Sequence, residues 1–204
     1  MGDAKESKIQ ESLNHVHEEI DACVVCREFI PSLKKPTAMR RGGPGNVVIV
    51  GIAPGNQEYA TSVAFSGQSG KKLDEWLINA GARPENPRNN IYFTSILKCQ
   101  DSAGRFDDMA HRCRKFLNRQ LEILRPTLVI SLGQRPYEHL RFSDIPYAAA
   151  LCQLQTAEEV LLSQFSFDYN LLPWPHPSGL NRQLNDDSIR RRLENSFQIL
   201  KRYL

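Results

Sequence analysis

The residues of this sequence that are best suited to chemistry lie around His176. The stretch LLPWPHPSGLNR, residues 171–182, is an apolar run that leads into three prolines, and the histidine stands between Pro175 and Pro177. Proline fixes its own φ angle and restricts the residue before it, so this backbone is stiff. We interpret His176 as a catalytic side chain that has to be held in place. The alternative is a histidine with a purely structural role.

The cysteines form a second group with potential chemistry. Cys23 and Cys26, in CVVC, place two thiolates within reach of one metal. Thirteen residues separate Cys99 from Cys113, whereas a zinc ribbon has a second Cys-x-x-Cys pair. Four thiolates from separate segments also suit an iron–sulfur cluster. Cys152, within AAALCQL, is expected to be a small buried apolar residue. The spacing alone does not decide between a zinc site and an iron–sulfur cluster.

Two glycine-containing loops offer backbone N–H groups to a ligand. GIAPGNQE, residues 51–58, follows an apolar run, although Gly and Pro there are equally typical of a simple tight turn. AFSGQSG, residues 64–70, comes shortly after, and its glycines allow a ligand to approach the backbone closely. Phe65 precedes these glycines. A phenylalanine is more often a core residue, but here it is also suited to be an exposed platform on which a planar base stacks.

The surrounding segments alternate between strand and helix patterns. Strands are predicted where β-branched and apolar residues follow one another. The first lies in residues 46–55 and runs into a turn, and the others are residues 89–98, 127–133 and 168–175. Helices are predicted at residues 1–20, 69–81, 108–124, 135–142 and 186–204, the last with an aspartate cap. This order predicts an α/β fold with a four-stranded parallel sheet between helices.

Ligands of such a sheet bind at the carboxyl ends of its strands. The loops expected at that edge are residues 51–58, 98–105, 133–137 and 175–182. His176 and the first glycine-containing loop are therefore predicted to meet at one edge. We expect a single domain over residues 1–204, since this length can bury a full core.

The composition restricts the class of protein. Of the 204 residues, 41% are hydrophobic and 24% are charged, and the net charge of +3 is compatible with a polyanionic partner. No apolar run reaches the roughly 18 residues of a membrane helix, and the polar start MGDAKESKIQ is unlike a secretory signal. We expect a cytoplasmic monomer with no membrane association and no disulfide framework.

Four stretches occur in the order and spacing of the uracil-DNA glycosylase superfamily. They are residues 51–67, 92–99, 124–133 and 176–182. Together with Cys23, Cys26, Cys99 and Cys113 they most closely resemble the iron–sulfur branch called family four, over roughly residues 20–200. The resemblance implies a three-layer sandwich and a structural [4Fe–4S] cluster. These four cysteines would hold the cluster, two of them from the N-terminal helical segment.

The resemblance also implies roles for the residues of the pocket. In these enzymes the histidine of the His-Pro-Ser motif faces a carbonyl oxygen of the base, where negative charge develops as the N-glycosidic bond breaks. The expected catalytic residues are His176, Glu58 and Asn56, with a water held near residues 51–58. The expected base-binding residues are Gly51, Ala53, Gly55, Phe65 and Ser95, with the base stacked on the phenylalanine.

The rest of the histidine loop is expected to contact DNA. Ser178 and Gly179 match positions that bind backbone phosphates. Leu180 matches the wedge residue that fills the gap left by a flipped base. Asn181 and Arg182 are expected to contact the opposite strand or its phosphates.

Two positions depart from the pattern of family four. That family usually has a glutamate where this chain has Ile52, which cannot activate water, while Glu58 remains available as a carboxylate. The asparagine that reads the base is replaced by Ser95, and one hydroxyl cannot pair with both N3–H and O4 of uracil. The smaller side chain also widens the pocket. These departures favour a bulkier modified pyrimidine, such as the hypermodified cytosines of some phages, over plain uracil.

The predicted function is a monofunctional DNA glycosylase that flips out a damaged or modified base and leaves an abasic site, in repair or phage defence. No lysine stands out as a Schiff-base nucleophile. Two alternatives remain open. One is a nucleic-acid-binding protein that kept this fold and lost the chemistry, and the other is a redox sensor that uses the cluster.

Overall fold

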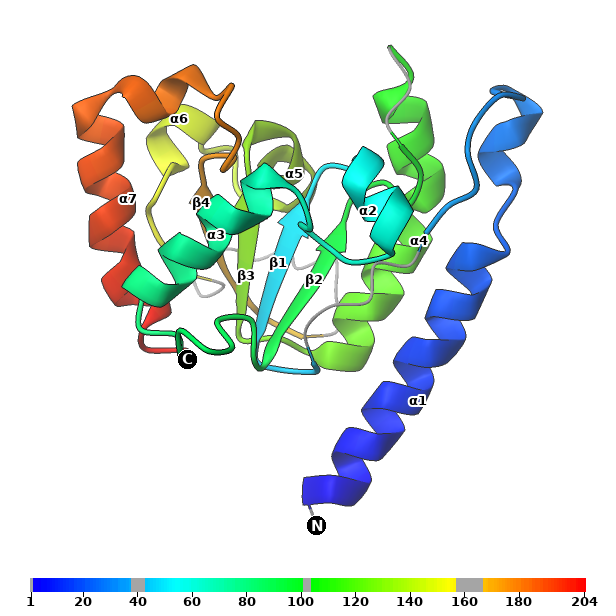
Figure 1. Cartoon of the computed structure of the whole chain (residues 1–204), viewed down its shortest axis with the longest axis horizontal. Coiled ribbons are helices and arrows are strands. Elements are labelled where there is room, and N and C mark those ends of the chain that lie inside the picture. Colours follow the sequence, from blue (N-terminus) through cyan, green and yellow to red (C-terminus); the bar gives the residue numbers. More distant parts are fainter. Residues whose placement is uncertain (1, 38–42, 101–103, 157–166) are drawn as a thin grey trace.

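The computed structural model describes residues 2–37, 43–100, 104–156 and 167–204. At its centre lies a sheet of four parallel strands, β1 (Val47–Gly51), β2 (Ile91–Ser95), β3 (Leu128–Leu132) and β4 (Asn170–Trp174). Their order across the sheet is β2-β1-β3-β4 (Figure 1). The structure confirms the predicted α/β fold with its four-stranded parallel sheet.

The strands form where the sequence is apolar on both faces. Every residue of β1, β2 and β3 is buried, as expected for a parallel sheet that is covered on both sides. The register aligns the carboxyl ends, because Gly51 lies opposite Ser95 and Leu132 lies opposite Trp174. His176 follows β4 by two residues, so it lies at the same edge as the loops after β1 and β2.

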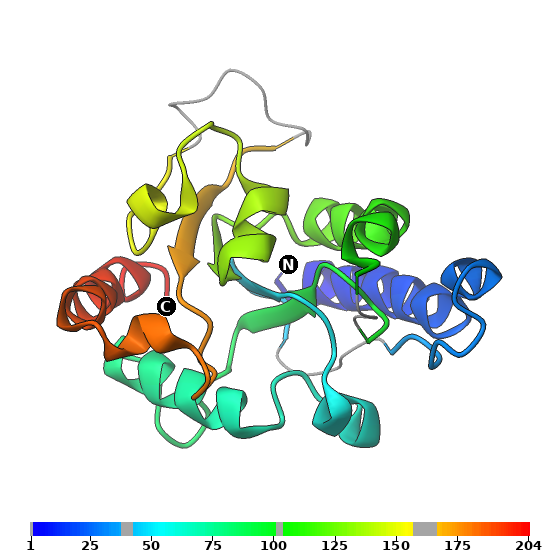
Figure 2. The same ribbon diagram turned by 90° about the horizontal axis from the view of Figure 1, so that it is seen from above.

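Helices cover both faces of the sheet, which makes three layers (Figure 2). α3 (Gln68–Asn79) and α7 (Asp187–Leu200) lie on one face, and α1 (Gly2–Asp21), α4 (Phe106–Leu124) and α5 (Gln134–Leu140) lie on the other. The shorter elements are α2 (Asn56–Thr61), α6 (Tyr147–Ala150) and the 3₁₀ turns Val25–Glu28 and Arg182–Asn185. Across the described ranges, no helix is both long and apolar enough to cross a membrane.

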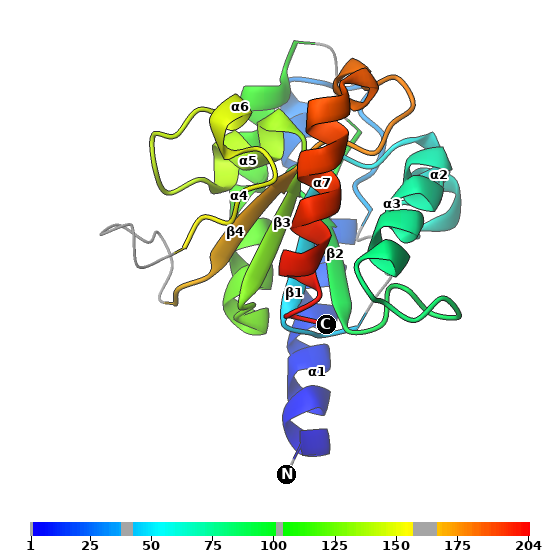
Figure 3. The same cartoon turned by 90° about the vertical axis from the view of Figure 1, so that its left-hand side faces the viewer.

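Aromatic side chains fill the layer between the sheet and α3 and α7. The ring of Trp174 on β4 meets Trp76 of α3 and Phe197 of α7 edge-on, with ring centroids 6.0 and 5.6 Å apart. Figure 3 shows α7 lying along the sheet on this side. The predicted aspartate cap of α7 is confirmed, since the Asp186 carboxylate accepts a hydrogen bond from the Ser188 N–H.

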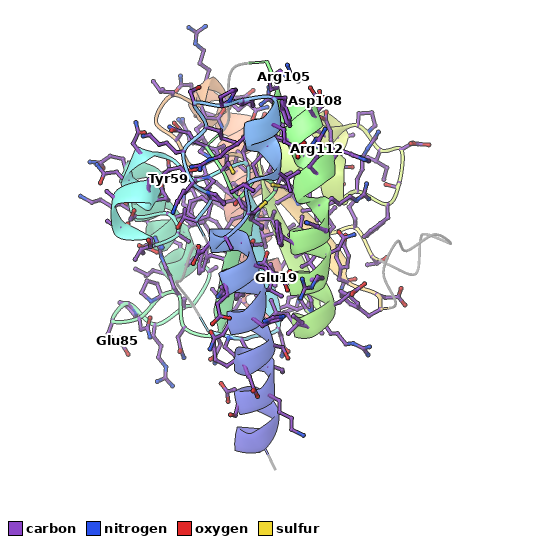
Figure 4. All side chains as sticks on the ribbon, turned by 90° about the vertical axis from the view of Figure 1, so that its right-hand side faces the viewer. Glu19, Tyr59, Glu85, Arg105, Asp108 and Arg112 are labelled. Atoms are coloured by element: carbon purple, nitrogen blue, oxygen red, sulfur yellow. The ribbon has the colours of Figure 1, made fainter. Side chains whose placement is uncertain are left out.

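The opposite layer joins the N-terminal helix to α4. Val16 and Ile20 of α1 pack against Phe116 of α4 in a small apolar cluster of their own. Glu19, labelled in Figure 4, binds Arg119 of α4 beside this cluster. The lower part of α1 projects beyond the amino edge of the sheet, away from the strand ends at which the candidate site lies (Figure 3).

Two local features differ from the expectation based on sequence. α2 begins at Asn56 inside a stretch that is predicted as a loop, and none of its residues is buried, so no apolar periodicity marks it. β2 ends at Ser95, three residues before the predicted end. The N–H groups of Ile96 and Leu97 still donate to the carbonyls of Gly51, the last residue of β1, and of Ile52, so the chain after β2 continues beside β1.

Candidate active site

A pocket of about 390 Å³ opens at the carboxyl ends of β1, β2 and β4. This volume falls in the range of about 300–1,000 Å³ that is typical of small-molecule sites. The residues predicted from sequence that line it are Gly51, Ala53, Gly55, Glu58, Phe65, Ser95 and His176. Ile52, Pro54, Ser69 and Gln100 complete the lining. Segments from four parts of the chain therefore converge as the strand pattern predicts.

The loop after β4 fixes both the position and the tautomer of His176. Its Nδ1 accepts a hydrogen bond from the backbone N–H of Ser178 at 3.2 Å, so a neutral imidazole carries its hydrogen on Nε2. Its backbone carbonyl accepts a second bond from Asn181 Nδ2 at 2.9 Å. Burial lowers the pKa of His176 below its ordinary value, which favours the neutral ring. The side chain is thus prepared to act as a neutral donor through Nε2.

Glu58 lines the pocket and also holds its loops together. One carboxylate oxygen accepts the N–H of Gly55 at 3.0 Å, and the other accepts the N–H of Ser66 at 2.9 Å. The carboxylate thereby ties the loop after β1 to the segment that carries Phe65. Each oxygen retains a lone pair that can accept a hydrogen bond from water.

Ser95, the last residue of β2, offers the pocket an acceptor. Its hydroxyl donates to the carbonyl of Leu97 at 2.6 Å, which occupies its only hydrogen. The oxygen can still accept a bond from an N–H group of a base. While the bond to Leu97 is kept, Ser95 cannot donate to a carbonyl oxygen such as O4 of uracil.

Asn56, which is predicted to be catalytic, lies on the exposed surface of α2 and is not among the lining residues. Its side-chain oxygen accepts a hydrogen bond from Gln100 Nε2 at 3.0 Å. Gln100 does line the pocket, and its backbone N–H donates to the hydroxyl of Tyr59 at 2.6 Å. Sequence analysis missed Gln100 and Ser69, because no periodicity distinguishes loop residues that face a cavity from those that face solvent.

The rest of the histidine loop presents one apolar side chain to solvent. Leu180 is 91% exposed, the highest exposed fraction among the large apolar residues that the structure describes. Ser178 Oγ accepts the Leu180 N–H at 3.2 Å, and Asn181 Oδ1 accepts a backbone N–H of the next turn at 3.1 Å. Ser178 and Asn181 therefore brace the loop from within. The other two predicted DNA contacts, Gly179 and Arg182, are exposed.

Four cysteines surround a small space between the Val25–Glu28 turn, the segment after β2, and α4. They are Cys23, Cys26, Cys99 and Cys113, all of them free thiols. Cys152 instead lies near Ser196 and Arg192 of α7. Among the described residues, no three His, Cys, Asp or Glu side chains form a group that could hold a metal ion. Thiolates of a [4Fe–4S] cluster stand further apart than ligands of one ion, because each binds a different iron.

Burial favours the neutral form of three of these four thiols. Burial raises the pKa of Cys26 to about 11 and that of Cys99 to about 12, and neighbouring cysteines add to both shifts. Burial raises the pKa of Cys113 as well. A metal group would have to displace these protons.

Lys98 connects the cysteine space to the pocket. Its side chain is buried, and Nζ donates to Thr94 Oγ1 and to the Ser95 carbonyl at 2.7 Å each, and to Gln120 Oε1 at 2.9 Å. It also lines the cysteine space. Burial lowers the pKa of Lys98 to about 7. This amine fastens the end of β2 to α4, the helix that carries Cys113.

Comparison with known proteins identifies relatives of this chain. The model of the uracil DNA glycosylase superfamily matches residues 43–198, well over half of the chain. The type-4 uracil-DNA glycosylase of Archaeoglobus fulgidus is 35% identical over 130 residues, which are 61% of this chain and 61% of that protein. The proteins of the same name from Sulfurisphaera tokodaii and Saccharolobus solfataricus are 22% and 25% identical, over 94% and 95% of this chain and 84% and 87% of theirs.

The chain thus spans about three-fifths of the length of the Archaeoglobus relative and more than four-fifths of the other two. The matched region contains the whole sheet, the pocket and the loop that carries His176. On this combined evidence of sequence and geometry, the chain belongs to the uracil DNA glycosylase superfamily.

Proposed function

We propose that this protein is a monofunctional DNA glycosylase that hydrolyses the N-glycosidic bond of uracil or of a modified pyrimidine. The observation that carries the proposal is one pocket lined by the ring of Phe65, the neutral donor His176 and the acceptor Ser95. The name of the relatives, type-4 uracil-DNA glycosylase, supports the same reaction. The role is base excision in repair or in defence against phage DNA.

The chemistry assigned to these residues is leaving-group stabilisation. The base flips into the pocket and stacks on Phe65. As the bond between C1′ and the base nitrogen breaks, its electron pair leaves with the base, and Nε2–H of His176 donates to the carbonyl oxygen on which charge accumulates. Water adds to C1′ and releases a proton to solvent. Because the bond breaks largely before water adds, Glu58 need only orient this water, and Ile52 is tolerated.

We also propose that Cys23, Cys26, Cys99 and Cys113 hold a [4Fe–4S] cluster. Its contribution is a structural cross-link, which ties the segment after α1 to the end of β2 and to α4. The support is that the four thiols face one space from three separate segments, while the fifth cysteine lies elsewhere.

The proposal is tested with duplexes that each carry one uracil, one modified cytosine or only normal bases, followed by alkaline cleavage at abasic sites. The protein should generate breaks at uracil or at the modified base and none in the normal duplex. Mass spectrometry of bases released from natural DNAs, including modified phage genomes, would identify the preferred one. Binding to these DNAs without release of any base would support the nucleic-acid-binding alternative instead.

Base choice should respond to Ser95. Ser95→Asn supplies a carboxamide that can both donate to O4 and accept from N3–H of uracil, so uracil release should rise by about tenfold or more. The larger side chain should also slow the release of a bulkier base. Ser95→Ala is the matched control, because it removes the hydroxyl without adding a donor and should not raise uracil release. Wild-type uracil release that already equals that of the type-4 relatives would contradict this prediction.

Leu180 should matter on duplex DNA and not on single strands. The duplex has to be forced open around the flipped base, which costs a few kcal/mol, whereas a single strand needs no wedge. Leu180→Ala should therefore slow base release from duplex by about tenfold and from single strands by less than about twofold. Leu204→Ala, which alters another exposed leucine, serves as the control. Equal losses on both substrates would show that Leu180 is not a wedge.

A further inference from the structure

Arg88 is a buried cation between β2 and the segment that carries Phe65. Its side chain is only 4% exposed. The Nε and Nη2 groups both donate to the carboxylate of Asp74 on α3, so the pair is bidentate. The guanidinium also lies over the ring of Phe93 on β2, 5.2 Å from its centroid. Asp74 and Phe93 thus hold the guanidinium of Arg88 from two sides.

The remaining donors of Arg88 hold the backbone around Phe65. Nη1 donates to the carbonyl of Ala64 at 2.7 Å, and Nη2 donates to the carbonyls of Phe65 and Gly70 at 2.9 and 3.3 Å. One side chain therefore binds the residue that precedes the ring, the residue that carries it and the helix that follows. No other described side chain is shown to donate to these three carbonyls.

Phe65 needs this support because its backbone is unusual. Its φ is +51°, in the left-handed region that residues with a side chain rarely adopt and that is therefore strained. Its ring lies so close to the end of β1 that a Cβ on Gly51 would be 2.9 Å from it. A Cβ on Gly70 would be 1.6 Å from the Phe65 carbonyl oxygen. The ring also meets Phe93 edge-on, with centroids 6.0 Å apart.

We propose that Arg88, held by Asp74, is a positioning residue that keeps Phe65 in this strained conformation, so that its ring forms the stacking wall of the pocket. This inference rests on the proposed function, since it assumes that a base enters the pocket. It assigns to Arg88 the role of positioning Phe65, which lies 23 residues earlier in the sequence. Lysine cannot replace arginine here, because an ammonium lacks the planar set of five donors that reach the Asp74 carboxylate and three backbone carbonyls at once.

The test compares two DNA probes. A duplex with the 2′-fluoro-2′-deoxynucleoside of the base that the wild-type protein releases fastest presents a base that resists excision, and a duplex with a tetrahydrofuran abasic site presents none. Arg88→Lys should weaken binding of the first by about tenfold, within the range of one base–aromatic stack, and of the second by less than about twofold. A general loss of structure would weaken both. Arg83→Lys, at an exposed arginine in the turn after α3, is the matched control.

Two further variants complete the test. Phe65→Ala should show the same selective loss, and Arg88→Lys should add nothing to it, because the ring that Arg88 positions is gone. The quantity compared is the ratio of the Kd values for the two probes. If Arg88→Lys does not fold, Asp74→Asn weakens only the anchor of the guanidinium and should change this ratio in the same direction by a smaller factor. An unchanged ratio, or additive losses in the double variant, would overturn the proposal. A wild-type protein that does not prefer the base-containing probe would instead contradict the proposed function.

Discussion

Replacing His176 by alanine should lower the rate of base release by about 10²–10³-fold, the usual effect of removing one oxyanion donor. The reason lies in the geometry of its loop. Nδ1 is occupied by the Ser178 N–H and burial favours the neutral ring, so Nε2 carries the hydrogen that we propose stabilises the departing base. A single-turnover assay with enzyme in excess, which follows excision of the base from a radiolabelled or fluorescent strand, would give this rate directly.

DNA binding should survive the same substitution, because phosphate contacts carry most of the affinity for DNA. Binding of the abasic duplex by the alanine variant is therefore the control for intact structure. His111→Ala, at an exposed histidine on α4, should leave the rate unchanged. A His176→Ala protein that releases base at the wild-type rate would show that another group stabilises the leaving base.

Cys113→Ser and Cys99→Ser should each abolish iron binding and destabilise the fold by more than about 3 kcal/mol, which for a chain of this length is roughly 6–12 °C in Tm. Protein purified without oxygen should be brown, and the serine variants should be colourless. The expected destabilisation is large because the proposed cluster would tie three segments together. Iron analysis and thermal unfolding followed by circular dichroism would measure both effects.

Cys152→Ser is the matched control for the cluster. This cysteine is also buried, but it lies near Ser196 and Arg192, so the variant should keep its iron and colour. A colourless wild-type protein with one zinc per chain would contradict the cluster. So would wild-type levels of iron in either the Cys99 or the Cys113 variant.

The apolar pattern of the sequence by itself determined the fold class and the edge at which the site lies. Strands such as Val47–Gly51 and Leu128–Leu132 are continuous apolar runs, because both of their faces are buried. Local patterns of this kind depend on neighbours along the chain, so they can be recognised without a structure. The stiff prolines around His176 and the glycines beside Phe65 are local in the same sense, and the structure places both residues in the pocket.

Only the tertiary structure decided which polar side chains line the pocket and which of them hold the surrounding loops in place. It places Asn56 outside the pocket and Gln100 within it, turns Glu58 toward two backbone N–H groups, and directs Arg88 to Phe65. The physical reason is that a polar side chain in a loop takes its partner from whatever segment the fold brings near. The partners of Glu58 lie 3 and 8 residues away, that of Arg88 lies 23 residues away and that of Asn56 lies 44 residues away, and no local periodicity marks any of them.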